Sequence, residues 1–249
     1  MVKDMGDLTG RVAIVTGAAG GIGRAVCETL AMHGAIIAGA DMNQEGLNET
    51  IRLVEEAGGQ MSGFPLNVME LSSVQEMMKS VDEKYGHIDI LVNVAGILSG
   101  ARYDEVTTEM WDKMIDINLR GYHYCNQSVV PYMAKNGGGS VVSISSQAGQ
   151  VGGWLGSVAY SASKGGILAL TKGYARQTQQ YHIRFNDVAP GRMLTPMTAA
   201  RGDKPEGIPV GRLGTAQDVA NAVYFLASDL SAFVDGTCID VNGGEFMRS

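Results

Sequence analysis

The stretch that decides the fold is Arg11–Gly23, which reads RVAIVTGAAGGIG. Its first part, Arg11–Thr16, is a short apolar run typical of a buried strand. Its second part is rich in glycine, and the following Ile22–His33 has the spacing of a helix that stops at Gly34. Glycines between a strand and a helix allow a sharp turn and let a diphosphate approach the free N–H groups of the helix start. The stretch therefore predicts a dinucleotide-binding turn at the beginning of a parallel sheet.

The rest of the chain repeats the order strand, then helix. We predict strands at Arg11–Thr16, Ala35–Ala40, Met61–Leu66, Ile88–Val92, Ser140–Ser145, Ile183–Val188 and Cys238–Val241. We predict helices at Ile22–His33, Asn43–Ala57, Leu71–Tyr85, Thr108–Ala134, Val158–Gln180 and Thr215–Ala227. Short apolar strands that alternate with helices indicate a parallel sheet covered on both faces. We therefore expect an α/β protein, with a Rossmann-type, doubly wound, parallel seven-stranded sheet and helices on both faces, in one dinucleotide-binding catalytic domain over residues 1–249.

Composition excludes several classes of function. The 249 residues are 45% hydrophobic and 18% charged, which is ordinary for a folded domain with a large core. The formal net charge is −7 and no basic stripe is visible, so we expect no binding to nucleic acid or to an anionic membrane surface. No apolar run approaches the roughly 18 residues that span a bilayer, and residues 1–10 lack the apolar segment of a secretory signal. We expect a cytoplasmic protein.

The three cysteines are Cys27, Cys125 and Cys238, which are far apart in the sequence and lie in apolar surroundings. Such cysteines are typical of packing residues in a reducing compartment. No CxxC pair or cluster of histidines and cysteines is present. We therefore expect no bound metal.

Asp41 ends the second predicted strand. A carboxylate at this place accepts hydrogen bonds from both hydroxyls of an adenosine ribose and repels a 2′-phosphate. No lysine or arginine stands at Gly20, Met42 or Asn43 to attract such a phosphate. The sequence therefore favours NAD over NADP as the cofactor. A solvated helix cap is the alternative role for Asp41.

Tyr160 and Lys164 lie four residues apart at the start of a predicted helix, so their side chains share one face. A free phenol has a pKa of about 10 and is a poor base at neutral pH. A neighbouring ammonium and a positive nicotinamide ring favour the phenolate and lower this pKa. The pair can therefore provide an acid/base group, although on an arbitrary helix the same spacing more often marks a surface pair.

Two further positions can support this chemistry. The preceding strand ends at Ser145 and Ser146, at the sheet edge where ligands of such folds bind, and a serine hydroxyl there can hold a substrate oxygen. Asn118 lies inside a predicted helix, although asparagine is a mediocre helix former. It can bend the helix and hold a water, or it can be an exposed helix position.

Several ordered motifs together resemble those of the short-chain dehydrogenase/reductase family in its common single-domain form. The resemblance runs from Gly10 to Gly244. It rests on Thr16–Gly23, Asp41, Asn93–Gly96, Asn118, Ser146, Tyr160 with Lys164, Pro190 and Gly191 with Thr195, and Gly236–Gly244.

The resemblance implies a role for each matching residue. Tyr160 would donate and accept the proton, and Ser146 would polarise the substrate oxygen. Lys164 would bind the nicotinamide ribose and lower the tyrosine pKa, and Asn118 would anchor a water in a proton relay. The implied cofactor-binding positions are Gly17, Gly21, Ile22, Gly23, Asp41, Asn67, Val68, Asn93, Ala95, Gly96, Tyr160, Lys164, Pro190, Gly191 and Thr195.

The sequence departs from the family pattern in three places. Asn67 stands where the family usually has aspartate, but its amide oxygen can still accept from the adenine amino group. Val94 replaces the second asparagine of the family's Asn-Asn-Ala-Gly motif. Ser146 lies one residue further from Tyr160 than usual, so Ser145 stays the weaker candidate for the catalytic hydroxyl.

Three segments should shape the substrate pocket, because loops at strand ends usually carry specificity. They are Gly96–Tyr103, Gln147–Ser157 with Trp154, and Thr195–Pro209 with Met197. Gln147, Trp154 and Met197 are the candidate pocket residues, and Trp154 can equally be a subunit contact.

We expect an NAD-dependent oxidoreductase that transfers a hydride between a small secondary alcohol, or its ketone, and nicotinamide. The resemblance also implies a homotetramer built on the two long helices and the C-terminal strand. Two alternatives stay open. A 3-oxoacyl-(acyl-carrier-protein) reductase would need a basic patch beside the site and NADPH, whereas Asp41 and the net charge count against it. A non-catalytic NAD-binding regulatory protein would not need Asn118, Ser146, Tyr160 and Lys164.

Overall fold

The computed structural model describes residues 4–153, 157–195, 197–198 and 202–247. Within them, one seven-stranded parallel sheet has the order β3-β2-β1-β4-β5-β6-β9. Its strands are β1 (Val12–Thr16), β2 (Ile36–Asp41), β3 (Gln60–Pro65), β4 (Ile90–Asn93), β5 (Gly139–Ile144), β6 (Ile183–Pro190) and β9 (Cys238–Val241). The predicted doubly wound, Rossmann-type sheet is confirmed.

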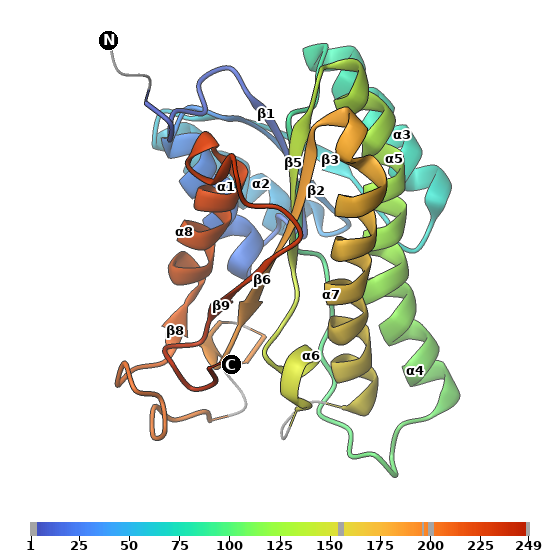
Figure 1. Cartoon of the computed structure of the whole chain (residues 1–249), viewed down its shortest axis with the longest axis vertical. Coiled ribbons are helices and arrows are strands. Elements are labelled where there is room, and N and C mark those ends of the chain that lie inside the picture. The colour runs from blue at the N-terminus through green and yellow to red at the C-terminus, as the bar shows by residue number, and fades with distance from the viewer. Residues whose placement is uncertain (1–3, 154–156, 196, 199–201, 248–249) are drawn as a thin grey trace.

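Helices cover both faces of the sheet (Figure 1). One face carries α1 (Gly21–Met32), α2 (Gln44–Glu56) and α8 (Ala216–Ala227), and the other carries α3 (Leu71–Tyr85), α4 (Thr108–Ile115), α5 (Gly121–Lys135) and α7 (Val158–Thr178). Each face has its own cluster of buried apolar side chains, because parallel strands are apolar on both sides. Smaller elements are α6 (Ala148–Val151) and a two-stranded ladder of β7 (Met193–Leu194) and β8 (Gly214–Thr215).

The long helix predicted at Thr108–Ala134 is continuous but not uniform. A π-helical turn at Asp116–Arg120 separates α4 from α5 and contains the buried Asn118. Single π turns inside α-helices are frequent at functional sites, because they redirect one side chain. The bend expected from Asn118 therefore takes the form of a widened turn.

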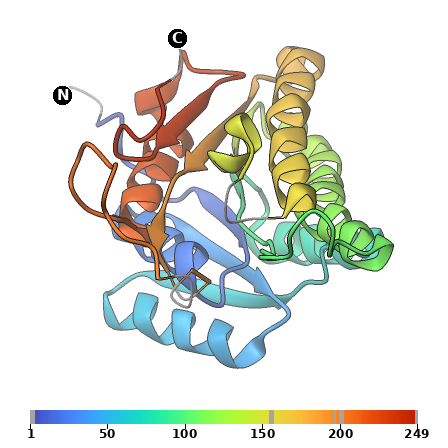
Figure 2. The same ribbon diagram turned by 90° about the horizontal axis from the view of Figure 1, so that it is seen from below.

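The strand order reverses direction between β1 and β4, which are neighbours in the sheet but not in the sequence. In open α/β sheets, ligands bind beyond the carboxyl ends of the strands at such a switch point. In Figure 2 this end of the molecule faces the viewer, with α6 and the start of α7 beside it. The strand order alone therefore predicts that the candidate site lies at this end of the sheet.

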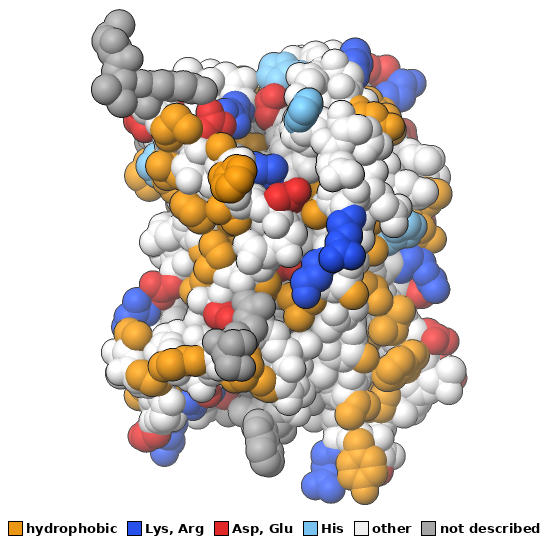
Figure 3. Space-filling view, in the orientation of Figure 1, with side chains coloured by type: hydrophobic (Ala, Val, Ile, Leu, Met, Phe, Trp, Pro, Cys, Tyr) orange, Lys and Arg blue, Asp and Glu red, His pale blue; other side chains and the backbone are white. Residues whose placement is uncertain are grey.

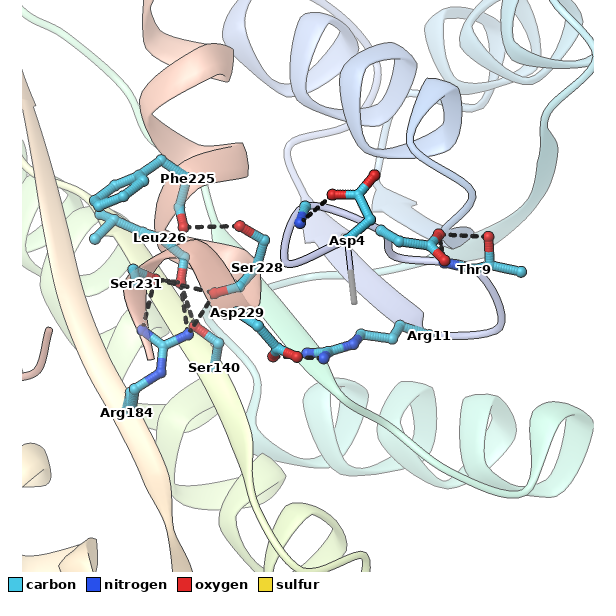
Figure 4. Close-up of polar contacts among 12 residues, drawn as sticks. Asp4, Thr9, Arg11, Ser140, Arg184, Phe225, Leu226, Ser228, Asp229 and Ser231 are labelled. Carbon is cyan, nitrogen blue, oxygen red and sulfur yellow. Dashed lines mark hydrogen bonds and ion pairs between the residues drawn. The ribbon is translucent and has the colours of Figure 1, made fainter. Parts of the chain in front are cut away.

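The opposite end of the sheet is fastened by Arg184 (Figure 4). Its guanidinium donates to the carbonyls of Leu226 and Ser228 at the end of α8, and to Ser231 Oγ and the carbonyl of Val234. Burial lowers the pKa of Arg184. A cation suits the carbonyl end of a helix, so Arg184 anchors α8 to β6.

Arg184→Met removes these donors and leaves buried carbonyls with fewer partners. We expect the free energy of unfolding to fall by about 2–3 kcal/mol, measured by chemical denaturation. Arg52→Met is the control, because Arg52 pairs with Glu49 and Glu56 on the exposed surface of α2 and exposed pairs contribute little. Equal stability of the two variants would show that Arg184 is not an anchor.

Candidate active site

A cavity of about 1330 Å³ lies at the carboxyl ends of the strands. This exceeds the usual volume of a pocket for one drug-sized ligand, and it suits a dinucleotide together with a small substrate. Its walls come from the turn between β1 and α1, the end of β2, the segments after β4 and β5, the start of α7, and the chain after β6. The first two form one half of the cavity, and the segment after β5 and the start of α7 bring the candidates Ser146, Tyr160 and Lys164.

The glycine turn fits closely against the segment after β4. Gly17 has a φ of 69°, and a Cβ there would lie 2.9 Å from the backbone nitrogen of Ala95. A Cβ on Gly23 would lie 2.0 Å from the carbonyl oxygen of Gly17. Thr16 Oγ1 holds the two segments together by accepting from the backbone N–H groups of Val94 and Ala95. A side chain at Gly17 would therefore push the turn away from the segment after β4, and one at Gly23 would push α1 away from the turn.

On its other side the turn is open. A Cβ on Gly20 or Gly21 would meet no atom within 4 Å. The start of α1 has no side-chain cap. Backbone N–H groups at an uncapped helix start attract negative charge. These features fit the diphosphate of a dinucleotide.

Asp41 lies at the same end of the cavity. One of its carboxylate oxygens accepts from the backbone N–H of Ala19 at 3.1 Å, and the other accepts from that of Asn43 at 2.9 Å. These bonds fix the carboxylate between the glycine turn and the start of α2. Each oxygen keeps a lone pair that a ribose hydroxyl can use.

Tyr160 and Lys164 lie together on α7 and both line the cavity. Lys164 Nζ is 5.8 Å from the centre of the Tyr160 ring. Ser157 caps this helix by accepting from the backbone N–H of Tyr160, so the tyrosine sits in the first turn. The expected juxtaposition of phenol and ammonium beside the glycine turn is thus present.

The Lys164 side chain is almost completely buried. Its Nζ donates to the carbonyl oxygen of Ile144 at 2.7 Å and lies 3.5 Å from the hydroxyl of Tyr122. Burial lowers the pKa of Lys164 from 10.5 to about 7, while the charge of Asp187 opposes that shift. The ammonium is therefore buried beside the cavity, where the Ile144 carbonyl and the Tyr122 hydroxyl are its neighbours.

Ser146 and Ser145 differ in what their hydroxyls contact. Ser145 Oγ is buried and donates to the carbonyl of Val188, within the sheet. Ser146 Oγ accepts from the backbone N–H of Ala148, so its own proton stays available, and Ser146 lines the cavity. Ser146 is therefore the better placed of the two hydroxyls.

The segment after β5 reaches α7 through a close contact of glycines. A Cβ on Gly149 would lie 2.5 Å from the backbone carbon of Lys164 and 2.6 Å from the nitrogen of Gly165. The short helix α6 can therefore lie directly on α7. This contact brings Ser146 and Gln147 to the side of the cavity that holds Tyr160.

Two predicted residues lie behind the cavity wall. Asn118 is buried, and its amide pairs with both the N–H and the carbonyl of Ile97, so it anchors the segment after β4. Asn93 is also buried and donates to Asn126 and Ser143. Asn93 is not among the residues that line the cavity, and its side chain points into the core beneath α5, because strand side chains alternate between faces; a contact with the cofactor stays a prediction.

The other predicted residues mostly line the cavity. On the cofactor side these are Gly17, Gly21, Ile22, Gly23, Asp41, Asn67, Val68, Ala95, Gly96, Pro190, Gly191 and Thr195, and on the substrate side Gln147 and Met197. Trp154 lies outside the described residues. Among the described residues, no group of three or more histidines, cysteines and acids could hold a metal.

Sequence reasoning missed several contacts. Tyr122 beside Lys164 has no distinguishing motif. Arg192 forms an ion pair with Glu245 at 2.8 Å, across the end of the cavity. Neither residue belongs to a motif, and the pair joins segments far apart in the chain, so only the folded structure could reveal it.

Comparison with known proteins identifies the family. A family model described as Enoyl-(Acyl carrier protein) reductase matches residues 17–245. The crystal structure of a short-chain type dehydrogenase/reductase from Mycobacterium marinum is similar, with a TM-score of 0.95 and 28% identity, over 98% of this chain and 99% of that one. This chain belongs to the short-chain dehydrogenase/reductase family. It is therefore an oxidoreductase, and members of this family bind a nicotinamide cofactor.

Curated relatives in this family include reductases of acyl chains. The chain is 40% identical to the 3-oxoacyl-(acyl-carrier-protein) reductase FabG of Thermotoga maritima, over 95% of this chain and 98% of the relative. The Escherichia coli K12 protein of the same name is 37% identical, over 96% and 98%. An uncharacterized oxidoreductase, YxbG of Bacillus subtilis, is 35% identical, over 96% and 92%.

Two further observations concern the helices and the cysteines. Among the described residues, none of the helices has the length and apolar character needed to cross a membrane. The three cysteines are free, and burial raises the pKa of the Cys125 thiol to about 12. This makes Cys125 an inert packing residue.

Lys164→Met should abolish turnover and stabilise the cofactor-free protein. Because the pKa of Lys164 is lower in the folded than in the unfolded chain, folding becomes less favourable as pH falls from about 10 to about 7. At about pH 7 we expect the variant to gain about 1–3 kcal/mol in denaturation measurements, and to gain less near pH 10. Lys172→Met, on the exposed side of α7, is the control. A less stable Lys164→Met protein at pH 7 would contradict the burial argument.

Proposed function

We propose that this protein is an NAD-dependent dehydrogenase that interconverts a small secondary alcohol and its ketone. One observation carries the proposal: Tyr160, Lys164 and Ser146 line the same cavity as the glycine turn and Asp41. The two halves of that cavity match the two tasks of such an enzyme, which are to hold a dinucleotide and to move a proton.

Ser146, Tyr160 and Lys164 have separate roles in the proposed proton transfer. In the direction of oxidation, Ser146 Oγ holds the alcohol oxygen, and Tyr160 accepts the hydroxyl proton as the carbon–oxygen double bond forms. The Lys164 ammonium favours the phenolate form of Tyr160 by its charge. A bound nicotinamide would supply the acceptor for the hydride that leaves the carbinol carbon. In reduction, the same proton returns from Tyr160 to the oxygen.

NAD is the proposed cofactor because of the surroundings of Asp41. Its carboxylate is fixed by two backbone N–H groups where the adenosine ribose would lie. The cavity-lining Arg24 donates to Thr50 Oγ1 and to the carbonyl of Ala19, so its guanidinium is already used within the chain. A 2′-phosphate there would meet the negative charge of Asp41, whereas the described bonds of the Arg24 guanidinium point to neutral oxygens of the chain.

A 3-oxoacyl-(acyl-carrier-protein) reductase is the second candidate, and the names of the similar proteins from Thermotoga maritima and Escherichia coli favour it. An acidic carrier protein would be drawn to free basic side chains at the cavity mouth. Of the described arginines that line the cavity, Arg24 and Arg192 are both bonded within the chain. The net charge of −7, together with Asp41, favours a free small molecule over an acidic carrier. A non-catalytic NAD-binding role is disfavoured by the retained Ser146, Tyr160 and Lys164.

We also propose a cytoplasmic homotetramer, as the family resemblance implies. Two described features support an assembly. Strand β9 forms one edge of the sheet, and its four residues are each half-buried. Nearby in the chain, the side chain of Phe233 is fully exposed. Apolar groups next to an unpaired strand edge are suited to a subunit contact.

Tyr160→Phe tests the reaction. Removing the phenol hydroxyl should lower kcat by about 10²–10⁴-fold with any secondary alcohol that the protein oxidises, because the proton has no other acceptor of this kind. Formation of the reduced cofactor is followed by absorbance. Tyr132→Phe, on α5, is the matched control. Undiminished turnover by Tyr160→Phe would overturn the proposed mechanism.

Asp41→Ala tests the cofactor. Loss of the carboxylate removes both the ribose contacts and the repulsion of a 2′-phosphate. We expect the ratio of kcat/KM for NAD to that for NADP to fall by about tenfold or more. Glu45→Ala removes a nearby exposed carboxylate at the start of α2 and should leave the ratio unchanged. An unchanged ratio in Asp41→Ala would remove the case for NAD.

A further inference from the structure

Two side chains that ionise are buried inside this protein. Other charged side chains lie at least partly at the surface, as the red and blue groups on the visible face illustrate (Figure 3). Within the ranges that the structure describes, Asp187 is the one acid, and Lys164 the one lysine or arginine, whose side chain is buried. Lys164 has a place in the proposed reaction, whereas Asp187 has none. A buried carboxylate opposes folding unless it is compensated, so Asp187 needs a physical reason.

Asp187 lies on β6, on the face of the sheet that α5 and α7 cover. Phe185, two residues earlier, belongs to the apolar cluster of that face, and strand side chains alternate. Asp187 is paired in register with Ser143 of β5, the residue before Ile144, whose carbonyl accepts from Lys164 Nζ. One strand spacing of about 4.8 Å and one residue of about 3.3 Å separate Asp187 from Ile144. The two buried charges are therefore neighbours on one face of the sheet.

Helix α7 holds the carboxylate as well as the ammonium. Thr171 Oγ1 donates to Asp187 Oδ1 at 2.6 Å, and Thr171 is itself buried. Thr171 follows Lys164 by seven residues, which is about two helical turns, so both side chains lie on the inner face of α7. The hydrogen bond fixes Asp187 relative to the helix that carries Lys164.

On the helices packed over this pair, the other titratable groups are uncharged at neutral pH. Burial raises the pKa of the Tyr122 phenol, on α5, well above its usual range, and the charge of Asp187 adds to this rise. Burial also raises the pKa of Cys125, on α5, and that of Tyr174, on α7, to about 12. Asp187 and Lys164 therefore act on each other without a competing charge from these three groups.

The strands beside Asp187 bring few further groups. Strand β5, at Gly139–Ile144, carries no titratable side chain. Arg184, on β6, points to the opposite face, where it binds the end of α8. Cys238, on β9, is the register partner of Asp187 on its other side. At the start of α7, Tyr160 faces the cavity. Asp187 is thus the acid nearest to the buried ammonium on this face.

The charge of Asp187 acts against the effect of burial on Lys164. Burial lowers the pKa of Lys164 to about 7, and Asp187 opposes that fall. Without this negative charge the amine would lose its proton below neutral pH. A neutral amine has no charge with which to favour the phenolate of Tyr160.

We propose that Asp187 is a positioning residue of the active site, whose buried negative charge keeps Lys164 in the ammonium form at neutral pH, with Thr171 holding the carboxylate in place. Asp187 neither takes nor gives a proton during the reaction, and it acts through Lys164 alone. This inference rests on the proposed function, in which the ammonium promotes proton transfer by Tyr160.

Asp187→Asn tests the inference, because it removes the charge and keeps both the shape and an acceptor for Thr171. The titration of the Lys164 nitrogen is followed by NMR in the cofactor-free protein, and its signal is identified by its absence from Lys164→Met. We expect the midpoint to fall by about one pH unit or more, because two charges under about 10 Å apart in a protein interact by this much. General damage would admit water and move the midpoint upward instead, toward 10.5.

The matched control is Asp112→Asn, which removes an exposed carboxylate on α4. It changes the net charge equally and should leave the Lys164 midpoint where it is, because exposed charges are screened. A midpoint that is unchanged or raised in Asp187→Asn, or lowered equally in both variants, overturns the inference.

A reciprocal measurement serves if Asp187→Asn does not fold. Two coupled groups shift each other, so loss of the ammonium in Lys164→Met favours the neutral acid at Asp187. The carboxyl carbon of Asp187 should then titrate about one pH unit or more higher than in the unaltered protein, as followed by carbon NMR. An Asp187 titration that is the same in both proteins contradicts the proposed coupling.

Turnover distinguishes failure of this inference from failure of the proposed function. With a secondary alcohol that the protein oxidises, kcat of Asp187→Asn should be about fivefold lower than that of the unaltered protein at pH 7. The two should agree within about twofold at pH 5.5, where both amines are protonated. A lowered Lys164 midpoint with full turnover at pH 7 supports the coupling of the two charges and overturns the proposed use of the ammonium. An unmoved midpoint in an active enzyme overturns the role of Asp187 and leaves the proposed function intact.

Discussion

A buried ammonium held by one backbone carbonyl is the constraint around which the candidate active site is organised. Lys164 Nζ lies 2.7 Å from the carbonyl oxygen of Ile144, the last residue of β5, in surroundings dry enough to lower its pKa to about 7. Such a group opposes folding at neutral pH, and its retention is explained by function rather than by stability. In the mechanism that we propose, its charge acts on Tyr160, one helical turn earlier on α7.

The rest of the fold positions that charge beside the cavity. Strand β5 supplies the carbonyl, and the contact of Gly149 with Lys164 lays α6 against α7, which brings Ser146 to the same place. The π turn at Asn118 aims its amide at Ile97 and so fixes the segment after β4 on the other side. The two segments that follow the neighbouring strands β4 and β5 thereby meet the first turn of α7, which carries Tyr160.

The sequence was sufficient to predict the sheet, the glycine turn and the pairing of Tyr160 with Lys164, because each depends on local spacing and on the order of elements. It did not place Asn93, because the direction of a side chain at a strand end depends on register with the neighbouring strands. It gave no sign of the ion pair between Arg192 and Glu245, because long-range polar contacts leave no pattern in a single sequence.

The most direct measurement is the titration of the Lys164 ammonium itself, followed by nitrogen NMR on protein labelled at the lysine side chains. One resonance, absent from Lys164→Met, should titrate at about pH 7 in the cofactor-free protein, well below the 10.5 of an unperturbed lysine. If every lysine instead titrates near pH 10, the amine is not buried in a dry environment, and the proposed control of Tyr160 by a confined charge is contradicted.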